Sequence, residues 1–171
     1  MRIAGLDGQL AAGDLDGRAL LVGGDAHREF LAPSRFHEVL PDPDAPAPDQ
    51  VTRAVFCTGK VYYDLAAYRK ERNISDTIII RLEQIYPLAQ EQLTYLLAPY
   101  QKVRDFVWCQ EEPSNMGAWG HLRNRLGHLF ATSFRYAGRP PMACPAEGAK
   151  ALHAAAQKRL LAAAFGPRAQ S

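Results

Sequence analysis

The stretch VTRAVFCTGKVYYDLAAYRKERNISDTIIIRLEQ, residues 51–84, contains the pattern that decides the fold. Residues 51–59 form an apolar run that ends at a glycine, which predicts a buried strand followed by a turn. Residues 61–72 place apolar side chains at helical spacing. Residues 76–84 include three consecutive isoleucines, a β-branched run typical of a strand covered on both faces. This order predicts a parallel strand pair joined by a crossover helix.

The same alternation continues downstream. A helix is predicted to begin at Pro87, because the first helical position needs no N–H donor, and to end near Leu97. The remaining predicted elements are a strand over residues 103–112, a helix over 117–130, a strand over 133–136, a loop over 139–145 and a helix over 149–165. Strands alternating with helices predict an α/β fold, a three-layer sandwich with helices on both faces of a mostly parallel sheet.

The first fifty residues differ from the rest in texture and charge. Residues 1–29 are rich in Gly and Asp and form an atypical lead, and either a short strand near its end or poor order fits this composition equally well. Residues 30–50 form a Pro/Asp-rich lead-in and linker, because prolines in PDPDAPAPDQ favour extended backbone. Residues 51–166 form the predicted α/β domain, and residues 167–171 form a tail.

Composition excludes several classes of protein. The net charge is +2, which predicts neither nucleic acid nor a membrane as a default partner. The apolar share of 47% is that of a globular domain. No apolar run approaches the ~20 residues that span a bilayer. The N-terminus lacks a basic start followed by an apolar core, which favours a cytoplasmic location.

The cysteines and histidines form no recognisable metal site. Three cysteines without a CxxC pair argue against a disulfide scaffold and against zinc. Cys57 and Cys109 lie within apolar strands and are predicted to be small core residues, whereas Cys144 lies in a loop. His121 and His128 are seven residues apart on one predicted helix, which favours surface or interface histidines over metal ligands.

Glycine-rich nucleotide motifs and a hydrolase elbow are absent from the sequence. The nearest approach is TGK, residues 58–60, between a strand and a helix. Its N–H groups could hold an anion, but a tight turn with Lys60 on the surface is the favoured interpretation. Glu111 and Glu112 follow a strand, where a like-charge pair can supply acid–base chemistry. A structural role is favoured for both, because no nucleophile or metal ligand is near in sequence.

Arg135 and Arg139 flank another predicted strand end. Two guanidinium groups beside a loop and a helix N-terminus suit a phosphate or carboxylate. Salt bridges to Glu111 or Glu112 at the same end of the sheet explain the two arginines equally well.

Four motifs in order resemble one family: VFCTGKVYYDL (residues 55–65), IIRLEQIYPL (79–88), FVWCQEEPSNMGAW (106–119) and RYAGRP (135–140). The family is the C-terminal domain of the decarboxylase component of 2-oxoglutarate dehydrogenase, the thiamine-diphosphate-dependent first enzyme of a multienzyme complex. FLAPSRFHEVLPD, residues 30–42, resembles the lead-in to that domain. The first 29 residues do not resemble it.

The resemblance implies a transketolase-type C-terminal domain with a largely parallel sheet of about five strands. In the family, earlier domains hold thiamine diphosphate and magnesium and contribute the catalytic histidines. The resemblance therefore implies no catalytic residue in this chain, no cofactor bound by it alone, and no activity on its own. The whole enzyme decarboxylates 2-oxoglutarate and succinylates a lipoyl group.

The same resemblance implies a role in dimerisation. The expected partners are a second copy or the rest of the decarboxylase chain, and the lipoyl succinyltransferase component of the complex. We expect a C-terminal fragment of the decarboxylase. The alternatives are a separately encoded module that assembles with a cofactor-bearing chain, and a domain that binds an anionic regulator. Arg135, Arg139, Glu111, Glu112 and Lys60 are the candidate ligand or interface residues.

Overall fold

The computed structural model describes residues 36–144 and 150–167. The predicted lead over residues 1–29 lies outside these ranges. The chain divides after Phe36 into two units, and everything below concerns the second unit. Its elements in chain order are β1 (Val39–Leu40), β2 (Arg53–Cys57), α3 (Val61–Glu71), β3 (Thr77–Leu82), α4 (Gln90–Leu97), β4 (Asp105–Pro113), α5 (Trp119–Phe130), β5 (Arg135–Arg139) and α6 (Lys150–Phe165).

Five strands form one sheet in the order β1-β3-β2-β4-β5. Strands β3, β2, β4 and β5 run parallel, and β1 pairs antiparallel with β3. All six residues of β3 are buried, as its isoleucine run predicts. The predicted α/β class with a mostly parallel, five-stranded sheet is confirmed.

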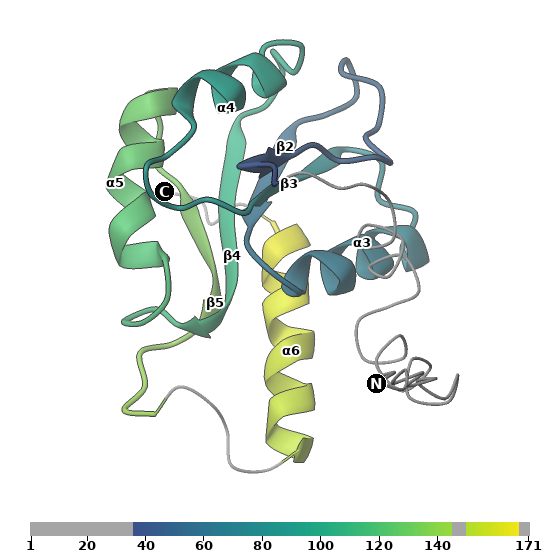
Figure 1. Cartoon of the computed structure of the whole chain (residues 1–171). Helices are drawn as coiled ribbons and strands as arrows, with labels where there is room; N and C mark the ends of the chain where they lie inside the picture. Colours follow the sequence, from purple (N-terminus) through teal and green to yellow (C-terminus); the bar gives the residue numbers. More distant parts are fainter. Residues whose placement is uncertain (1–35, 145–149, 168–171) are drawn as a thin grey trace, which may run out of the picture. The chain divides into compact units, whose positions relative to one another are not determined.

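Helices α4 and α5 cover one face of the sheet, and α3 and α6 cover the other (Figure 1). An apolar cluster fills each interface. On one face, Phe56 and Trp108 of the sheet pack with Leu93 of α4 and Leu122 of α5. On the other face, the sheet packs against α3 and α6, through residues such as Leu160. Strands buried on both faces need apolar residues at every position, which is why β2 and β3 lack the alternating pattern of a half-exposed strand.

Two predicted boundaries are wrong. Helix α4 begins at Gln90 and not at Pro87, because residues 84–89 form a turn in which the Gln84 amide donates to the Pro87 carbonyl at 2.7 Å. The last strand covers Arg135–Arg139 and not residues 133–136. It reaches into the predicted loop because a register shift in β4 carries the pairing on, from Cys109 with Ala137 to Pro113 with Arg139.

Strand β1 comes from residues 30–50, the lead-in that was predicted to be a linker. Strand β1 is only two residues long, with Val39 opposite Leu82 and Leu40 opposite Arg81. So short a strand shows no periodicity along the sequence. The strap that follows is anchored by Asp42, whose carboxylate pairs with Arg69 and accepts the N–H of Ile79 at 2.9 Å.

Candidate functional site

The carboxyl ends of β2 and β4 lie side by side at the point where the strand order reverses. Strand β2 is central: β3, which follows it in the chain, pairs with one side of β2, and β4 pairs with the other side. Ligands and partners of open α/β sheets gather at such a switch point. Two predicted site residues meet there, because Lys60 Nζ lies 2.9 Å from Glu111 Oε1.

This ion pair is exposed to solvent on the lysine side and buried on the glutamate side. The side chain of Lys60 is 60% exposed and that of Glu111 is 19% exposed. Solvent screens such a pair, so its contribution to the free energy of unfolding is small. Gly59, just before Lys60, has a φ of +67° and open space where a Cβ would lie. The turn TGK is therefore tight and leaves its lysine on the surface, as favoured from the sequence.

Glu112 contributes through its backbone. Its residue is exposed, and its carbonyl oxygen accepts the hydroxyl of Tyr136 at 2.9 Å and the amide of Gln110 at 3.2 Å. Burial raises the pKa of Tyr136 to about 12, although its contact with Gln110 works in the opposite direction. Tyr136 is thus a hydrogen-bond donor at neutral pH.

Gln110 is the polar centre of the segment that follows β4, and the sequence analysis did not single it out. Its side chain is buried, and Oε1 accepts the indole N–H of Trp108 at 2.8 Å and the backbone N–H of Trp119 at 3.0 Å. Its Nε2 donates to the carbonyls of Glu112, Pro113 and Met116. One amide therefore satisfies five groups. A glutamine inside an apolar strand was the available signal.

Asn115 connects this segment to the chain beyond β5. Its amide donates to the carbonyl of Met142 and accepts the N–H of Met142, both at 3.0 Å. The N–H of Ser114 donates to the carbonyl of Arg139 at 3.0 Å. The segment QEEPSN, residues 110–115, thus holds together the loops that follow β4 and β5.

The structure separates the two arginines that the sequence placed in one site. Arg135 begins β5 and Arg139 ends it. Arg135 therefore lies where the parallel strands begin (the amino edge), and Arg139 lies where they end (the carboxyl edge). The predicted alternative, a salt bridge from Arg135 to Glu111 or Glu112, is wrong for the same reason. Arg139 is 5% exposed, and a guanidinium nitrogen lies 3.0 Å from Nδ1 of His153 on α6.

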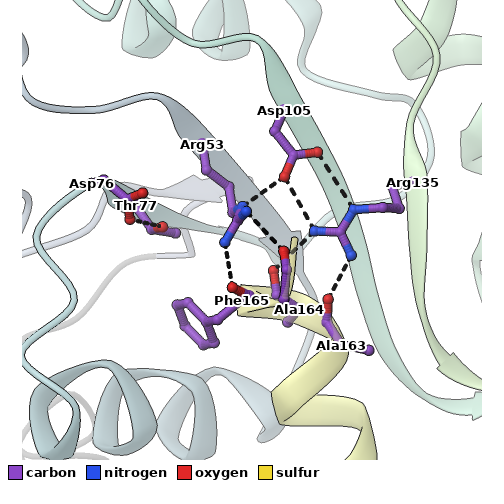
Figure 2. A network of polar contacts seen from close by, with 9 residues as sticks. Arg53, Asp76, Thr77, Asp105, Arg135, Ala163, Ala164 and Phe165 are labelled. Carbon is purple, nitrogen blue, oxygen red and sulfur yellow. Dashed lines mark hydrogen bonds and ion pairs between the residues drawn. The ribbon is translucent and has the colours of Figure 1, made fainter. Parts of the chain in front are cut away.

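Arg135 belongs to a polar network at the amino edge (Figure 2). Its guanidinium contacts the Asp105 carboxylate at 3.2 Å, and Arg53 contacts the same carboxylate at 2.6 Å. The two arginines also donate to carbonyls at the end of α6, those of Ala163, Ala164, Phe165 and Gly166. These carbonyls have no partner within the helix and carry the negative end of its dipole. The network therefore anchors α6 to the sheet.

Asp105 supplies the negative charge between the two arginines. Burial by itself would raise the pKa of Asp105, but hydrogen bonds and charges from Arg135 and Arg53 outweigh it and lower that pKa below its usual value. The carboxylate is therefore ionised at neutral pH.

Cys57 and Cys109 are neighbours in the sheet and lie in register on β2 and β4. Both are fully buried, as predicted, and burial raises the pKa of both thiols. A thiol that stays protonated is a poor nucleophile and a poor metal ligand. Cys144 is exposed.

Arg81, near the end of β3, is a buried cation that the sequence analysis did not single out. Its guanidinium carbon lies 4.7 Å from the Tyr62 ring, its Nη1 donates to the Tyr63 hydroxyl at 3.0 Å, and its Nε lies 2.9 Å from Glu83. The charge is stacked and paired, which fixes the start of α3 against the sheet.

Residues 36–144 and 150–167 contain neither a cluster of metal ligands nor a helix that could span a membrane. No group of three His, Cys, Asp or Glu side chains there is placed to hold a metal ion. None of the helices in these ranges is long and apolar enough to cross a membrane.

Comparison with known proteins gives one family. The family described as "2-oxoglutarate dehydrogenase C-terminal" matches residues 26–165. The chain is similar to the 2-oxoglutarate dehydrogenase E1 component of Azotobacter vinelandii, with 44% identity over 142 residues, 80% of this chain and 15% of the relative. It is also similar to that of Cupriavidus necator, with 43% identity over 137 residues, 79% of this chain and 14% of the relative. The chain thus spans about one seventh of the length of these relatives.

A solved structure shares the fold. A protein named "Split gene transketolase, inactive beta4 tetramer" superposes with a TM-score of 0.54, covering 79% of this chain and 43% of its own. The sequences are 12% identical, so this likeness concerns the fold alone. The predicted transketolase C-terminal-like architecture is confirmed.

Proposed function

The chain belongs to the 2-oxoglutarate dehydrogenase C-terminal family, and from that premise we propose that it acts as a non-catalytic assembly domain of the decarboxylase component. In this role it packs against the cofactor-bearing domains and stabilises their dimer. The observation that carries the proposal is that the family matches residues 26–165 while the chain spans only 15% of a full-length relative.

The activity proposed for the assembled enzyme is decarboxylation of 2-oxoglutarate and succinylation of a lipoyl group on the succinyltransferase component. Thiamine diphosphate and magnesium would be held by other domains. The described residues do not fit that cofactor, because they offer no cluster of metal ligands, and no chemical step is assigned to them.

The use of the polar side chains supports an assembly role. Gln110 is saturated by five partners, Asp105 is bound by two arginines, and Arg139 is buried against His153. Such groups hold the fold and are not available for a substrate. Lys60 and Glu112 are exposed at the carboxyl ends of the strands, and Glu111 is paired with Lys60. We assign the contact with the rest of the enzyme to these three residues. Arg135 lies at the opposite edge and is assigned to the fold.

The test is reconstitution. A 2-oxoglutarate dehydrogenase E1 component from Azotobacter vinelandii, truncated before the segment that matches this chain, is mixed with the purified chain. We expect a complex on size-exclusion chromatography, and recovery of 2-oxoglutarate-dependent ferricyanide reduction in the presence of thiamine diphosphate and magnesium. Lys60→Glu should weaken the complex, whereas Lys70→Glu on the outer face of α3 should not.

Two results would contradict the proposal. The first is turnover of 2-oxoglutarate by the chain alone, which would make it a catalyst. The second is a folded chain that does not associate with the truncated enzyme at any concentration tested.

A second candidate function is binding of an anionic regulator at the TGK turn. The observation that favours it is an exposed Lys60 at the start of α3, a helix whose N-terminus has no side-chain cap. Calorimetric titration with inorganic phosphate and with coenzyme A tests this function. Heat that disappears in Lys60→Ala supports it, and no heat with either ligand excludes it.

A further inference from the structure

A groove lies between α5 and the segment that leads into β5, at the edge of the sheet. We call it the α5 groove. Its lining residues are Trp119, Arg123, Asn124, Gly127, His128, Thr132, Ser133 and Phe134. Its volume is ≈ 410 Å³, enough for several side chains. Lys60, Glu111 and Glu112, which were assigned above to the contact with the rest of the enzyme, do not line this groove.

The wall and floor of the α5 groove include fixed aromatic side chains. Trp119 packs on Tyr136 with ring centroids 5.3 Å apart. Phe134 packs on Phe56 at 5.2 Å and on Phe106 at 5.4 Å. Rings held in this way cannot fold over to close the groove. The site therefore presents a preformed apolar surface to a partner.

No acidic residue lines the α5 groove. Residues 113–144 contain no aspartate or glutamate. Arg123 and His128 line the groove. Arg125, on the same helix, is exposed to solvent. Within the described ranges, none of these three side chains takes part in an ion pair with a carboxylate. The groove thus combines the positive charge of Arg123 with aromatic walls.

The groove also leads onto an edge strand. Strand β5 is the last strand of the sheet, and residues 132–134 run directly into it. An edge favours an extended partner, because main-chain groups there can accept a further segment. An extended chain that alternates carboxylates with apolar side chains would match both the cations and the rings.

We propose that the α5 groove is a docking site for an extended, acidic segment of a partner polypeptide, with carboxylates directed at Arg123 and His128 and an apolar side chain between Trp119 and Phe134. The apolar walls favour a polypeptide over nucleic acid, as does a net charge of only +2 for the whole chain.

The experiment uses the full 171-residue chain and two fluorescein-labelled peptide libraries. In the first library, Asp or Glu alternates with Leu or Phe over six positions. In the second, Asn or Gln replaces every acidic residue. Fluorescence anisotropy should show micromolar binding of the acidic library and about tenfold weaker binding of the amide library, because the amides cannot form charge-assisted hydrogen bonds with Arg123. Binding should weaken as salt is raised.

Matched variants locate the site. Arg123→Glu should weaken binding of the acidic library about tenfold or more, because it replaces attraction by repulsion. Lys158→Glu makes the same change of charge on α6 and should leave binding within about twofold. Circular dichroism of both variants verifies that the fold is intact.

Three outcomes would overturn the proposal. The acidic library could bind no better than the amide library. Arg123→Glu could have no larger effect than Lys158→Glu. A labelled dT12 oligonucleotide could bind more tightly than the acidic library and lose that binding in Arg123→Glu, which would make the groove a nucleic-acid site. None of these results depends on the reconstitution described above.

Discussion

The side-chain oxygen of Gln110 accepts the backbone N–H of Trp119 at 3.0 Å. This single contact joins the end of β4 to the first residue of α5. No side chain caps that helix, since Ala118 occupies the N-cap position. The buried glutamine therefore satisfies one of the N–H groups of the first turn that have no partner within the helix.

Replacing Gln110 tests how far the turn depends on this amide. In Gln110→Glu, a carboxylate replaces the Nε2 group that donates to three carbonyls, so a buried charge would face oxygen atoms. We expect a loss of about 3–5 kcal/mol in the free energy of unfolding, measured in urea. Glu112→Gln, a change at an exposed neighbour, should stay within about 0.5 kcal/mol. Equal midpoints for the two variants would contradict the role assigned to Gln110.

Asp105 predicts how stability changes with pH. Its pKa is lower in the folded protein than in the unfolded chain, so its contribution is complete above the unfolded value of about 3.9. That contribution is lost as the pH falls through the folded value. Asp105→Asn should therefore lower the free energy of unfolding at pH 7 by about 2–3 kcal/mol. In this variant the free energy of unfolding should also fall less steeply as the pH is lowered.

The measurement is thermal unfolding of both proteins between pH 7 and pH 3. Asp49→Asn, at an exposed position of the Pro/Asp-rich strap, serves as the control. A parallel acid decline in the wild type and in Asp105→Asn would show that the two arginines do not depend on this carboxylate.

The thiols should differ sharply in reactivity. Cys57 and Cys109 are buried and have raised pKa values, whereas Cys144 is exposed. We expect iodoacetamide at pH 8 to modify Cys144 in the native protein and all three cysteines only after unfolding. Mass spectrometry of the digested protein measures this pattern. Rapid labelling of Cys57 in the native state would contradict the packing of β2.

Two glycines form a matched pair for testing local strain. Gly59 and Gly117 have φ values of +67° and +64°, so an alanine at either position costs about 1–2 kcal/mol. A Cβ at Gly59 would meet open space, whereas one at Gly117 would lie 2.9 Å from Nε2 of Gln110. Because five hydrogen bonds hold that amide in place, Gly117→Ala should cost about 1–3 kcal/mol more than Gly59→Ala. Urea unfolding of the two variants measures this difference. Equal losses in the free energy of unfolding would mean that the Gln110 side chain can move to make room for the Cβ.

Much of the fold could be predicted because it depends on local patterns. The apolar run of β3 and the helical spacing of α3 predicted both elements to within a residue or two of their observed bounds. Strand β1 could not be predicted, because two residues carry no period. Its strand character comes only from pairing with Leu82 and Arg81, more than forty positions along the chain.

The candidate site shows the same division. Lys60, Glu111 and Glu112 were predicted as candidate site residues from their places after strands, and the structure brings Lys60 and Glu111 together. Arg135 was assigned to the wrong edge, because the predicted strand ended one residue after it, whereas the observed strand begins at it. An error of a few residues in a strand boundary thus placed the Arg135 side chain at the wrong end of the parallel strands.

The sequence by itself determined that this chain forms an α/β domain of one family, because hydrophobic periodicity and long motifs are properties of neighbouring residues. Only the tertiary structure decided which charges meet. Asp105 joins Arg53 and Arg135 because strand order and register bring the starts of β2, β4 and β5 together. Gln110 was one polar residue in an apolar strand until the fold surrounded it with five partners. Such contacts depend on how distant segments pack, and no local spacing in the sequence encodes that packing.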